Sequence, residues 1–164
     1  MENNNERFFE PVSRFSGKED EVIIPRRSTK YSAGYDFFAV EDVCIPPTFI
    51  IVDGNIVADK PKIVKTGVKA HMNRDNILYL FSRSSGPMKR GLVMANSVGC
   101  IDSDYYDADG EIGFMFYNFS PDTVLIKKGD KIGQGIFMEY LKVVDDNPES
   151  LADRVGGFGS TGNN

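Results

Sequence analysis

Residues 111–140 read EIGFMFYNFSPDTVLIKKGDKIGQGIFMEY, and this stretch decides the fold class. Apolar residues partly alternate with polar ones between residues 112 and 119, as expected of a half-buried β-strand. A second apolar run at residues 122–126 leads into the turn Lys128-Gly129-Asp130, and residues 131–140 carry a third strand pattern. Three strands separated by turn residues predict an all-β chain.

The same succession of short apolar runs and turn residues continues on the N-terminal side. Strand-like runs occur at residues 21–24, 37–40, 62–70, 77–81 and 91–95. Residues 49–58 predict a hairpin with Asp53-Gly54-Asn55 at its tip, whereas only residues 148–152 suggest a short helical turn. About ten strands and almost no helix favour a jelly roll or a related barrel.

Composition and charge restrict the class of partner. The 164 residues fit one domain that can bury a core, and 16 glycines and 8 prolines are more than a helical bundle tolerates. A net charge of −5 without a basic tail or stripe argues against a nucleic-acid polymer as partner. If such an acidic chain binds a polyphosphate, its few cations must converge on one site, and a divalent metal would help to neutralise the ligand.

The sequence also predicts a protein that works inside the cell. Cys44 and Cys100 show no framework spacing, and the single histidine, His71, leaves a zinc site short of ligands. The longest apolar-rich run is broken by Pro46 and Pro47 and is too short to cross a bilayer. The polar N-terminus has no signal-peptide core. We therefore expect a cytoplasmic protein with no membrane partner, or one in the host cytoplasm if the source is a phage.

The C-terminal residues 152–164 are rich in glycine and cannot bury a core, so we expect a flap that is mobile until a ligand holds it. Arg154, Ser160 and Thr161 offer a guanidinium group and two hydroxyls, and the glycines between them expose backbone N–H groups. Phe158 stands among glycines, which suits a ring that stacks on a base. The alternative is a disordered C-terminus. The predicted division is a β-rich core at residues 1–151 and a flap at residues 152–164.

Two loops in the middle of the chain carry candidate chemistry. Residues 81–91 read FSRSSGPMKRG, which is either a phosphate cradle after a buried strand or a turn capped by serines. Residues 96–105 read NSVGCIDSDY and place two carboxylates near a glycine and a tyrosine. Hydrolysis of a phosphoanhydride needs a group that orients water, and the carboxylate of Asp102 is the candidate. The alternative is an Asx-rich turn between two strands.

Two further segments carry weaker signals. Asp36 lies at a predicted strand start, where it either approaches a metal or caps a turn. Gln134 follows the turn at residues 128–130 and is either a surface amide or a phosphate donor. Ser84 lacks a candidate base, so water oriented by Asp102 is favoured over a serine nucleophile.

Taken together, these segments resemble the five ordered motifs of the trimeric dUTPase family. The matching segments are residues 32–39, 83–91, 96–112, 129–134 and 156–162. The resemblance implies a jelly-roll homotrimer with active sites between subunits, where the tail of one subunit closes over a site built by its neighbours. It also implies hydrolysis of dUTP to dUMP and pyrophosphate with Mg²⁺, which removes dUTP and supplies a precursor of dTTP.

The resemblance further implies a role for each site residue. Asp102 would orient the water that attacks the α-phosphorus, and Tyr105 would pack on the deoxyribose. The uracil edge would be read by Asn96 and by the backbone of a predicted hairpin that includes Gly99, Cys100, Ile101 and Gly113. The phosphate chain would be held by Arg83, Ser84, Ser85, Gly86 and Gln134.

The flap and the metal complete the implied site. Phe158 would stack on uracil, next to Gly159, and the γ-phosphate would be clamped by Arg154, Ser160 and Thr161. Mg²⁺ would be held mainly by the triphosphate oxygens, with Asp36 reaching it through water.

The chain departs from the family pattern in three places. Residues 106–109 lengthen the predicted uracil hairpin, residues 48–62 predict an exposed hairpin arm, and Arg154 lies one residue closer to Phe158 than in many members. The extra segments either bind a regulatory protein partner, as some phage dUTPases do, or are ordinary loop elaborations. The related dCTP deaminases need a glutamate at the position of Met115, so deamination is not expected.

Overall fold

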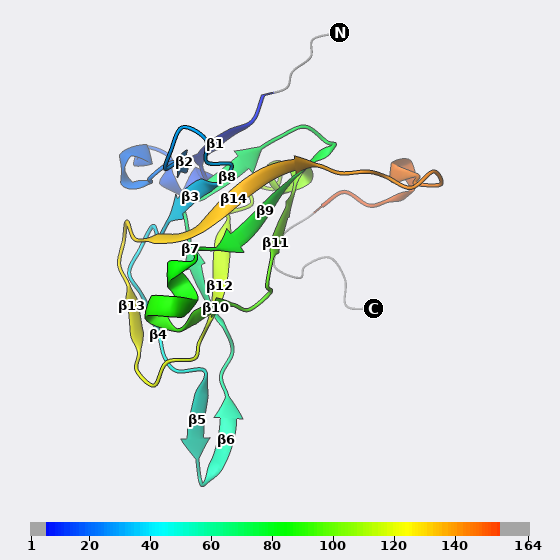
Figure 1. Cartoon of the computed structure of the whole chain (residues 1–164). Coiled ribbons are helices and arrows are strands. Elements are labelled where there is room, and N and C mark those ends of the chain that lie inside the picture. Colours follow the sequence, from blue (N-terminus) through cyan, green and yellow to red (C-terminus); the bar gives the residue numbers. More distant parts are fainter. Residues whose placement is uncertain (1–5, 155–164) are drawn as a thin grey trace.

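The computed structural model describes residues 6–154, whose paired strands are all antiparallel. A five-stranded sheet of order β11-β9-β14-β3-β2 contains β2 (Arg26–Arg27), β3 (Tyr35–Phe38), β9 (Asn76–Ser82), β11 (Gly99–Asp102) and β14 (Lys131–Glu139). A three-stranded sheet of order β10-β12-β7 contains β7 (Lys62–Lys65), β10 (Leu92–Met94) and β12 (Gly113–Asn118). Three strand pairs complete the fold (Figure 1): β1 (Phe8–Pro11) with β8 (Val68–His71), β4 (Val43–Ile45) with β13 (Val124–Ile126), and β5 (Phe49–Val52) with β6 (Asn55–Ala58).

Helical structure in the described residues is limited to short turns. They are η1 (Ser13–Phe15), η2 (Glu19–Glu21), η3 (Gly86–Arg90), η4 (Ser103–Tyr105) and η5 (Pro148–Ser150). Consecutive strands repeatedly change sheet, as β9 to β10, β11 to β12 and β13 to β14 do. Such crossing wraps two antiparallel sheets around one core, which is the jelly-roll arrangement predicted from the sequence.

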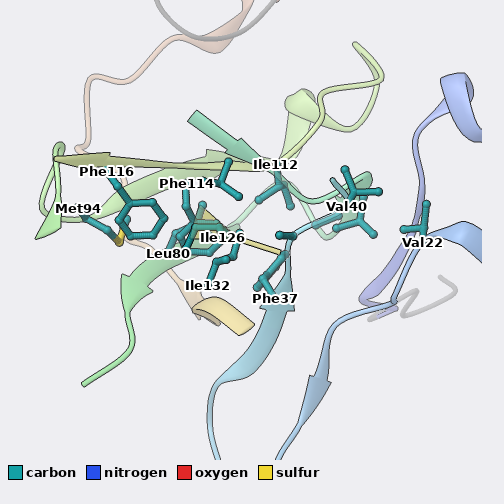
Figure 2. Packing of buried hydrophobic residues seen from close by; sticks show 14 of the residues in the cluster. Val22, Phe37, Val40, Leu80, Met94, Ile112, Phe114, Phe116, Ile126 and Ile132 are labelled. Carbon is teal, nitrogen blue, oxygen red and sulfur yellow. The ribbon is translucent and has the colours of Figure 1, made fainter. Parts of the chain in front are cut away.

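The core lies between the two larger sheets. Phe37 and Leu80 from the five-stranded sheet meet Phe114 from the three-stranded sheet, and all three are buried (Figure 2). The ring centroids of Phe37 and Phe114 are 5.5 Å apart, in a tilted arrangement. This contact joins the sheets, because aromatic side chains bury the largest apolar area that a residue can offer.

Two glycines on β14 permit this close packing. A Cβ atom at position 133 would lie 1.9 Å from Phe114 Cε1, and one at position 135 would lie 2.7 Å from Phe37 Cε2. Neither distance is physically possible, so any side chain at Gly133 or Gly135 would push the rings apart. Because side chains alternate along a strand, Gln134 between them points to the opposite face of the sheet.

One predicted strand is wrong, and three observed strands were not predicted. Residues 21–24 do not form a strand: after η2, Val22 inserts into the core while Ile23 and Ile24 stay about 40% exposed. β-Branched residues favour a strand only where a neighbouring strand supplies a partner, and none lies beside this run. The strands that were not predicted are β1, β2 and β4. β1 lacks alternation and is held by pairing with β8.

The hairpin predicted at residues 49–58 forms as β5 and β6 and projects from the body of the protein (Figure 1). Asp53 and Gly54 at its tip have φ angles of 49° and 79°, the left-handed pair that a two-residue hairpin turn requires. We call β5 and β6 the arm. Its exposed apolar residues are Phe49, Ile50, Ile51, Val52, Ile56 and Val57.

Candidate active site

A cavity of about 170 Å³ opens where the edge of the five-stranded sheet meets the start of β12. Its lining residues are Leu80, Asn96, Gly99, Cys100, Ile101, Asp102, Tyr105, Gly113, Met115 and Arg154. We call it the nucleoside cavity. Eight of the ten were predicted as site residues, and these eight come from three separate stretches of the chain.

The predicted uracil hairpin is wrong in one respect, because its two strands do not pair with each other. β11 pairs with β9, and β12 pairs with β10 and β7, so residues 103–112 form a connection between two sheets. A hydrogen bond of 2.8 Å from Gly110 N to Tyr105 O closes this 103–112 connection. The nucleoside cavity therefore has walls from both sheets rather than from one ribbon.

Leu80 and Met115 are lining residues that the sequence did not assign to binding. Leu80 is the register partner of Gly99, and a Cβ atom at position 99 would lie 3.0 Å from the Leu80 side chain. The alternation of β9 and β12 could have placed both residues, but only once the pairing of β9 with β11 was known. Met115 brings a thioether and no acid, so the described residues of the cavity lack the carboxylate that deamination needs at this position.

Tyr105 is held rigidly at the end of η4. Its hydroxyl donates to the backbone oxygen of Glu111 at 3.1 Å. A Cβ atom at Gly110 would lie 2.5 Å from three carbons of the ring, so the connection passes flat against one face of it. Burial raises the pKa of the Tyr105 hydroxyl, with a further contribution from the charge of Glu111, against the opposing charge of Arg154. The hydroxyl therefore stays protonated and keeps its role as a donor.

Asp102 lies at the end of β11, with its carboxylate beside the cavity. Arg154 pairs with it, Nη2 to Oδ2 at 2.5 Å, and also with Asp104, Nε to Oδ1 at 2.7 Å. The guanidinium group that was predicted to clamp a γ-phosphate thus lies on two carboxylates of its own chain. An anionic ligand at this place competes directly with Asp102 for the same cation.

A second cluster surrounds Asp36 on β3. Lys131 Nζ lies 2.7 Å from Asp36 Oδ2, the Ser28 hydroxyl donates to the same carboxylate, and Arg83 Nε lies 3.6 Å from Oδ1. Burial acts to raise the pKa of Asp36, but the hydrogen bonds from Lys131 and Ser28 and the charges of Lys131 and Arg83 outweigh it and lower the pKa. One carboxylate between two cations leaves a net positive cluster, which suits phosphate binding.

Gln134 belongs to the same cluster. It is the register partner of Asp36 on β3 and of Phe81 on β9, and its side chain lies over Gly34, where a Cβ atom would be 2.8 Å from Gln134 Oε1. Lys131 was not assigned a role by the sequence analysis. Its position next to the 128–130 turn gave no signal, because only the pairing of β3 with β14 brings it to Asp36.

Arg83, Ser85 and Gly86 line a separate cavity of about 60 Å³ together with Lys131. Ser84 belongs to the same loop and is exposed. This phosphate-loop cavity and the nucleoside cavity share no lining residue. A single chain therefore brings the predicted nucleoside residues together and the predicted phosphate residues together, but it does not join the two groups.

The resemblance implies a magnesium ion, and the polar side chains around Asp36 are the groups that would meet it. No group of three or more acidic, histidine or cysteine side chains within residues 6–154 could cage a metal. Asp36 Oδ1 lies 3.6 Å from Arg83 Nε, beyond hydrogen-bond distance, and can accept a hydrogen bond from metal-bound water. These residues fit a Mg²⁺ ion held chiefly by a polyphosphate, since Mg²⁺ usually keeps several waters and substrate phosphates as ligands. Phe158, Gly159, Ser160 and Thr161 lie outside the described residues.

The comparisons agree with the geometry. The sequence profile of the dUTPase family matches residues 20–162. A deoxyuridine 5'-triphosphate nucleotidohydrolase of Lactococcus lactis is 43% identical over 95% of this chain and 97% of its own length. The corresponding protein of Nautilia profundicola is 32% identical over 87% of this chain and 92% of its own length. No helix described here is long and apolar enough to cross a membrane.

Solved structures give the same result. The dUTPase of Streptococcus mutans superposes with a TM-score of 0.71 at 37% identity, covering 83% of this chain and 98% of that one. A dUTPase from phage phi11 of S. aureus gives a TM-score of 0.64 at 23% identity, over 90% of this chain and 100% of that one, which shows the shared fold alone. Because the family profile spans most of the chain and close relatives cover nearly all of it, the chain belongs to the dUTPase family.

Proposed function

We propose that this dUTP-hydrolysing enzyme releases dUMP and pyrophosphate through attack of a water molecule on the α-phosphorus, with Asp102 as the group that orients the water. The observation that carries the proposal is the position of the Asp102 carboxylate at the nucleoside cavity. In-line attack forms a bond from the water oxygen to the α-phosphorus and breaks the bond to the bridging oxygen, so pyrophosphate leaves. Asp102 accepts the proton that the water loses.

The nucleoside cavity accounts for recognition of a deoxynucleoside. Asn96 and the backbone at Gly99, Cys100, Ile101 and Gly113 offer polar groups to a uracil edge. The ring of Tyr105, fixed by Gly110 and the Glu111 carbonyl, presents a rigid wall to the sugar. A rigid wall excludes a 2'-hydroxyl on steric grounds, and the buried ring leaves a ribose oxygen without a hydrogen-bond partner.

The phosphate chain belongs with the cluster around Arg83. Arg83 and Lys131 supply positive charge, Ser84, Ser85 and Gln134 supply neutral donors, and Gly86 permits close approach of the loop. When bound, Mg²⁺ neutralises charge on the polyphosphate, and Asp36 is the residue that would contact its water shell. Phe158, Gly159, Ser160 and Thr161 are proposed to close over the nucleotide from the flap.

The separation of the two cavities in one chain supports a shared site in a homotrimer. A cavity that binds the nucleoside and a cluster that binds the phosphates must face each other for catalysis. Neither alone can orient water at the α-phosphorus, because positioning of both reactants supplies much of the rate. We therefore assign the nucleoside cavity of one subunit and the phosphate cluster of a neighbour to each active site.

Arg154 has two alternative sets of anionic partners in this mechanism. In the structure it pairs with Asp102 and Asp104, and the triphosphate offers stronger bidentate partners. Transfer of Arg154 to the γ-phosphate frees the Asp102 carboxylate for water. Arg154→Ala should raise KM for dUTP at least about tenfold while leaving inhibition by dUMP, which lacks a γ-phosphate, nearly unchanged. Equal weakening of dUTP binding and of dUMP binding by Arg154→Ala would contradict this role.

The catalytic role of Asp102 is tested by isotope and by substitution. In ¹⁸O-water with Mg²⁺, the heavy oxygen should appear in dUMP and not in pyrophosphate, because attack is at the α-phosphorus. Asp102→Asn should lower kcat by about 10²- to 10⁴-fold while nucleotide binding persists. The matched control is Asp107→Asn, which removes an exposed carboxylate of the same connection that pairs with Arg74. Near-normal turnover by Asp102→Asn, or label in pyrophosphate, would refute the mechanism.

Base selection is tested with dUTP, dCTP, dTTP and UTP as separate substrates. Pyrophosphate release should be fastest from dUTP. Ammonia release from dCTP at a comparable rate would overturn the exclusion of deamination that rests on Met115.

A regulatory protein partner is a second candidate role, and the exposed apolar arm is the observation in its favour. The arm lines neither the nucleoside cavity nor the phosphate-loop cavity. Contacts made through it would therefore leave hydrolysis intact.

A further inference from the structure

The 103–112 connection is fastened to residues near the N-terminus. Arg14 binds Glu111 with both arms of its guanidinium group, Nε to Oε2 at 3.0 Å and Nη2 to Oε1 at 2.5 Å. One residue earlier, Ser13 donates its backbone N–H to Asp109 Oδ2 at 3.0 Å, and its hydroxyl donates to the same carboxylate. These contacts join segments that are almost 100 residues apart in the sequence.

A third contact fastens the extra residues of the connection. The Tyr106 hydroxyl donates to Glu10 Oε1 at 2.8 Å. Lys69 on β8 lies between the two segments, with Nζ 3.3 Å from Glu10 Oε1, 3.0 Å from Asp109 Oδ1 and 4.5 Å from the centre of the Tyr106 ring. Residues 106–109 are therefore a docked element, and we call Glu10, Ser13 and Arg14 the N-terminal clamp.

Glu111 connects this clamp to Tyr105. Its carboxylate is fixed by both arms of Arg14 and by the backbone N–H of Gly67 at 2.9 Å, with Lys65 Nζ farther away at 3.6 Å, and only 13% of its side chain is exposed. Its backbone oxygen accepts the Tyr105 hydroxyl at 3.1 Å. The position of the tyrosine ring thus depends on a residue whose side chain is anchored outside the nucleoside cavity.

We propose that the N-terminal clamp positions Tyr105 through Glu111 and thereby sets the preference of the enzyme for deoxyribose over ribose. This inference rests on the proposed function, in which Tyr105 is the wall beside the sugar. None of the clamp residues lines the nucleoside cavity, so they act as positioning residues and not as catalytic residues.

The physical reason is that exclusion of a 2'-hydroxyl depends on the rigidity of the wall. A shift of the Tyr105 ring by only about 1 Å would make room for the 2'-hydroxyl oxygen of a ribose. Displacements of that size change rates by orders of magnitude. A ten-residue connection between two sheets carries enough conformational freedom for such a shift unless its ends and middle are fastened. Arg14, Ser13 and Glu10 fasten it at three successive points, at Glu111, Asp109 and Tyr106.

The test compares kcat/KM for dUTP and for UTP in the full-length enzyme with Mg²⁺. Arg14→Ala should lower the ratio of the two values about tenfold, mainly by raising KM for dUTP and by admitting UTP. The kcat for dUTP should stay within about threefold, because Asp102 is outside the network. Arg14→Lys keeps the charge but loses one arm of the contact, so it should restore part of the ratio.

Tyr105→Phe keeps the ring and removes only the hydrogen bond to Glu111. It should lower the dUTP-to-UTP ratio as Arg14→Ala does. The ratio of the double variant should be no lower than the lower of the two single-variant ratios, because both substitutions break one chain of contacts. The matched control is Arg74→Ala, which removes an exposed ion pair with Asp107 on the same connection and does not reach Glu111. Its ratio should equal that of the wild type.

The outcomes separate this inference from the proposed function. If Tyr105→Ala lowers the ratio but Arg14→Ala and Tyr105→Phe do not, the clamp has no role in selectivity and the inference is wrong. If Tyr105→Ala leaves the ratio unchanged, or if the wild type fails to cleave dUTP, the proposed site itself is wrong. A lower melting temperature of Arg14→Ala with an unchanged ratio would show a purely structural contact and would also overturn the inference.

Discussion

At the scale of single residues, the proposed function rests on two carboxylates whose partners differ. Asp102 is exposed and paired with a residue that a ligand can displace, whereas Asp36 is buried between Lys131 and Ser28. In the proposed mechanism the first carboxylate orients water once a ligand takes Arg154, whereas the second is held ionised as part of a cationic cluster. Sequence position alone does not distinguish the two, since each follows a large apolar or aromatic residue within a strand, Tyr35 in β3 and Ile101 in β11.

Asp109 gives a pH-dependent prediction at this scale. Burial acts to raise its pKa, but hydrogen bonds from Ser13 and Lys69 outweigh it, so the folded pKa lies below the ordinary value. Its contribution to stability is then fully present above the unfolded pKa of about 3.9 and is lost as the pH falls through the lower folded value. The difference in unfolding free energy between wild type and Asp109→Asn should be constant from about pH 5 to pH 8 and should shrink below about pH 4.

Urea denaturation across this pH range measures the difference. Asp53→Asn at the tip of the arm is the control, because it removes the same charge at an exposed turn. A difference for Asp109→Asn that grows as the pH falls would show that the ion pair with Lys69 does not stabilise the fold.

At the scale of elements, the arm is the part of the chain that the proposed chemistry does not use. A hydrogen bond of 2.7 Å from Asp59 N to Thr48 O closes the base of the arm, so residues 49–58 can be replaced by an Asp-Gly turn without moving the strand ends. Because the arm lines neither active-site cavity, kcat/KM for dUTP should stay within about twofold. A steady-state assay of pyrophosphate release measures this.

The same arm variant tests the second candidate role. If sedimentation of this variant shows a trimer and hydrolysis is unchanged, the exposed apolar residues serve neither catalysis nor assembly, and binding assays then test the regulatory role. Loss of hydrolysis would show that the arm completes an active site in the assembly. Replacing Ile50 and Ile51 by threonine offers a milder control, since it lowers apolar exposure and keeps the strand propensity.

At the scale of the whole molecule, the separate cavities predict complementation between subunits. Asp102→Asn disables the nucleoside side of a site, and Arg83→Ala disables the phosphate side. Each homotrimer should be nearly inactive, but an equal mixture that is unfolded and reassembled together should contain about one quarter of sites with both intact contributions. Pyrophosphate release near a quarter of the wild-type rate is the expected result.

The control is the same mixture combined without unfolding, in which subunits do not exchange. Activity that stays absent after co-refolding, with a trimer confirmed by sedimentation, would place Asp102 and Arg83 of one chain in the same site and contradict the shared arrangement. Recovery only after exchange would support it, because no single polypeptide in the mixture carries both groups.

The sequence by itself determined the all-β class, the positions of most strands and the motifs that meet at the nucleoside cavity. Local chemistry suffices there: turn residues end strands, alternation shows a half-buried face, and Asp53-Gly54 favours a two-residue hairpin turn. Only the tertiary structure decided that residues 21–24 stay unpaired, that β11 and β12 belong to different sheets, and that Lys131 meets Asp36. It also decided that Arg14 pairs with Glu111, whose backbone oxygen accepts the Tyr105 hydroxyl. The physical reason is that strand partners and ion pairs lie far apart along the chain, and nothing in either segment specifies the other until the core has brought them together.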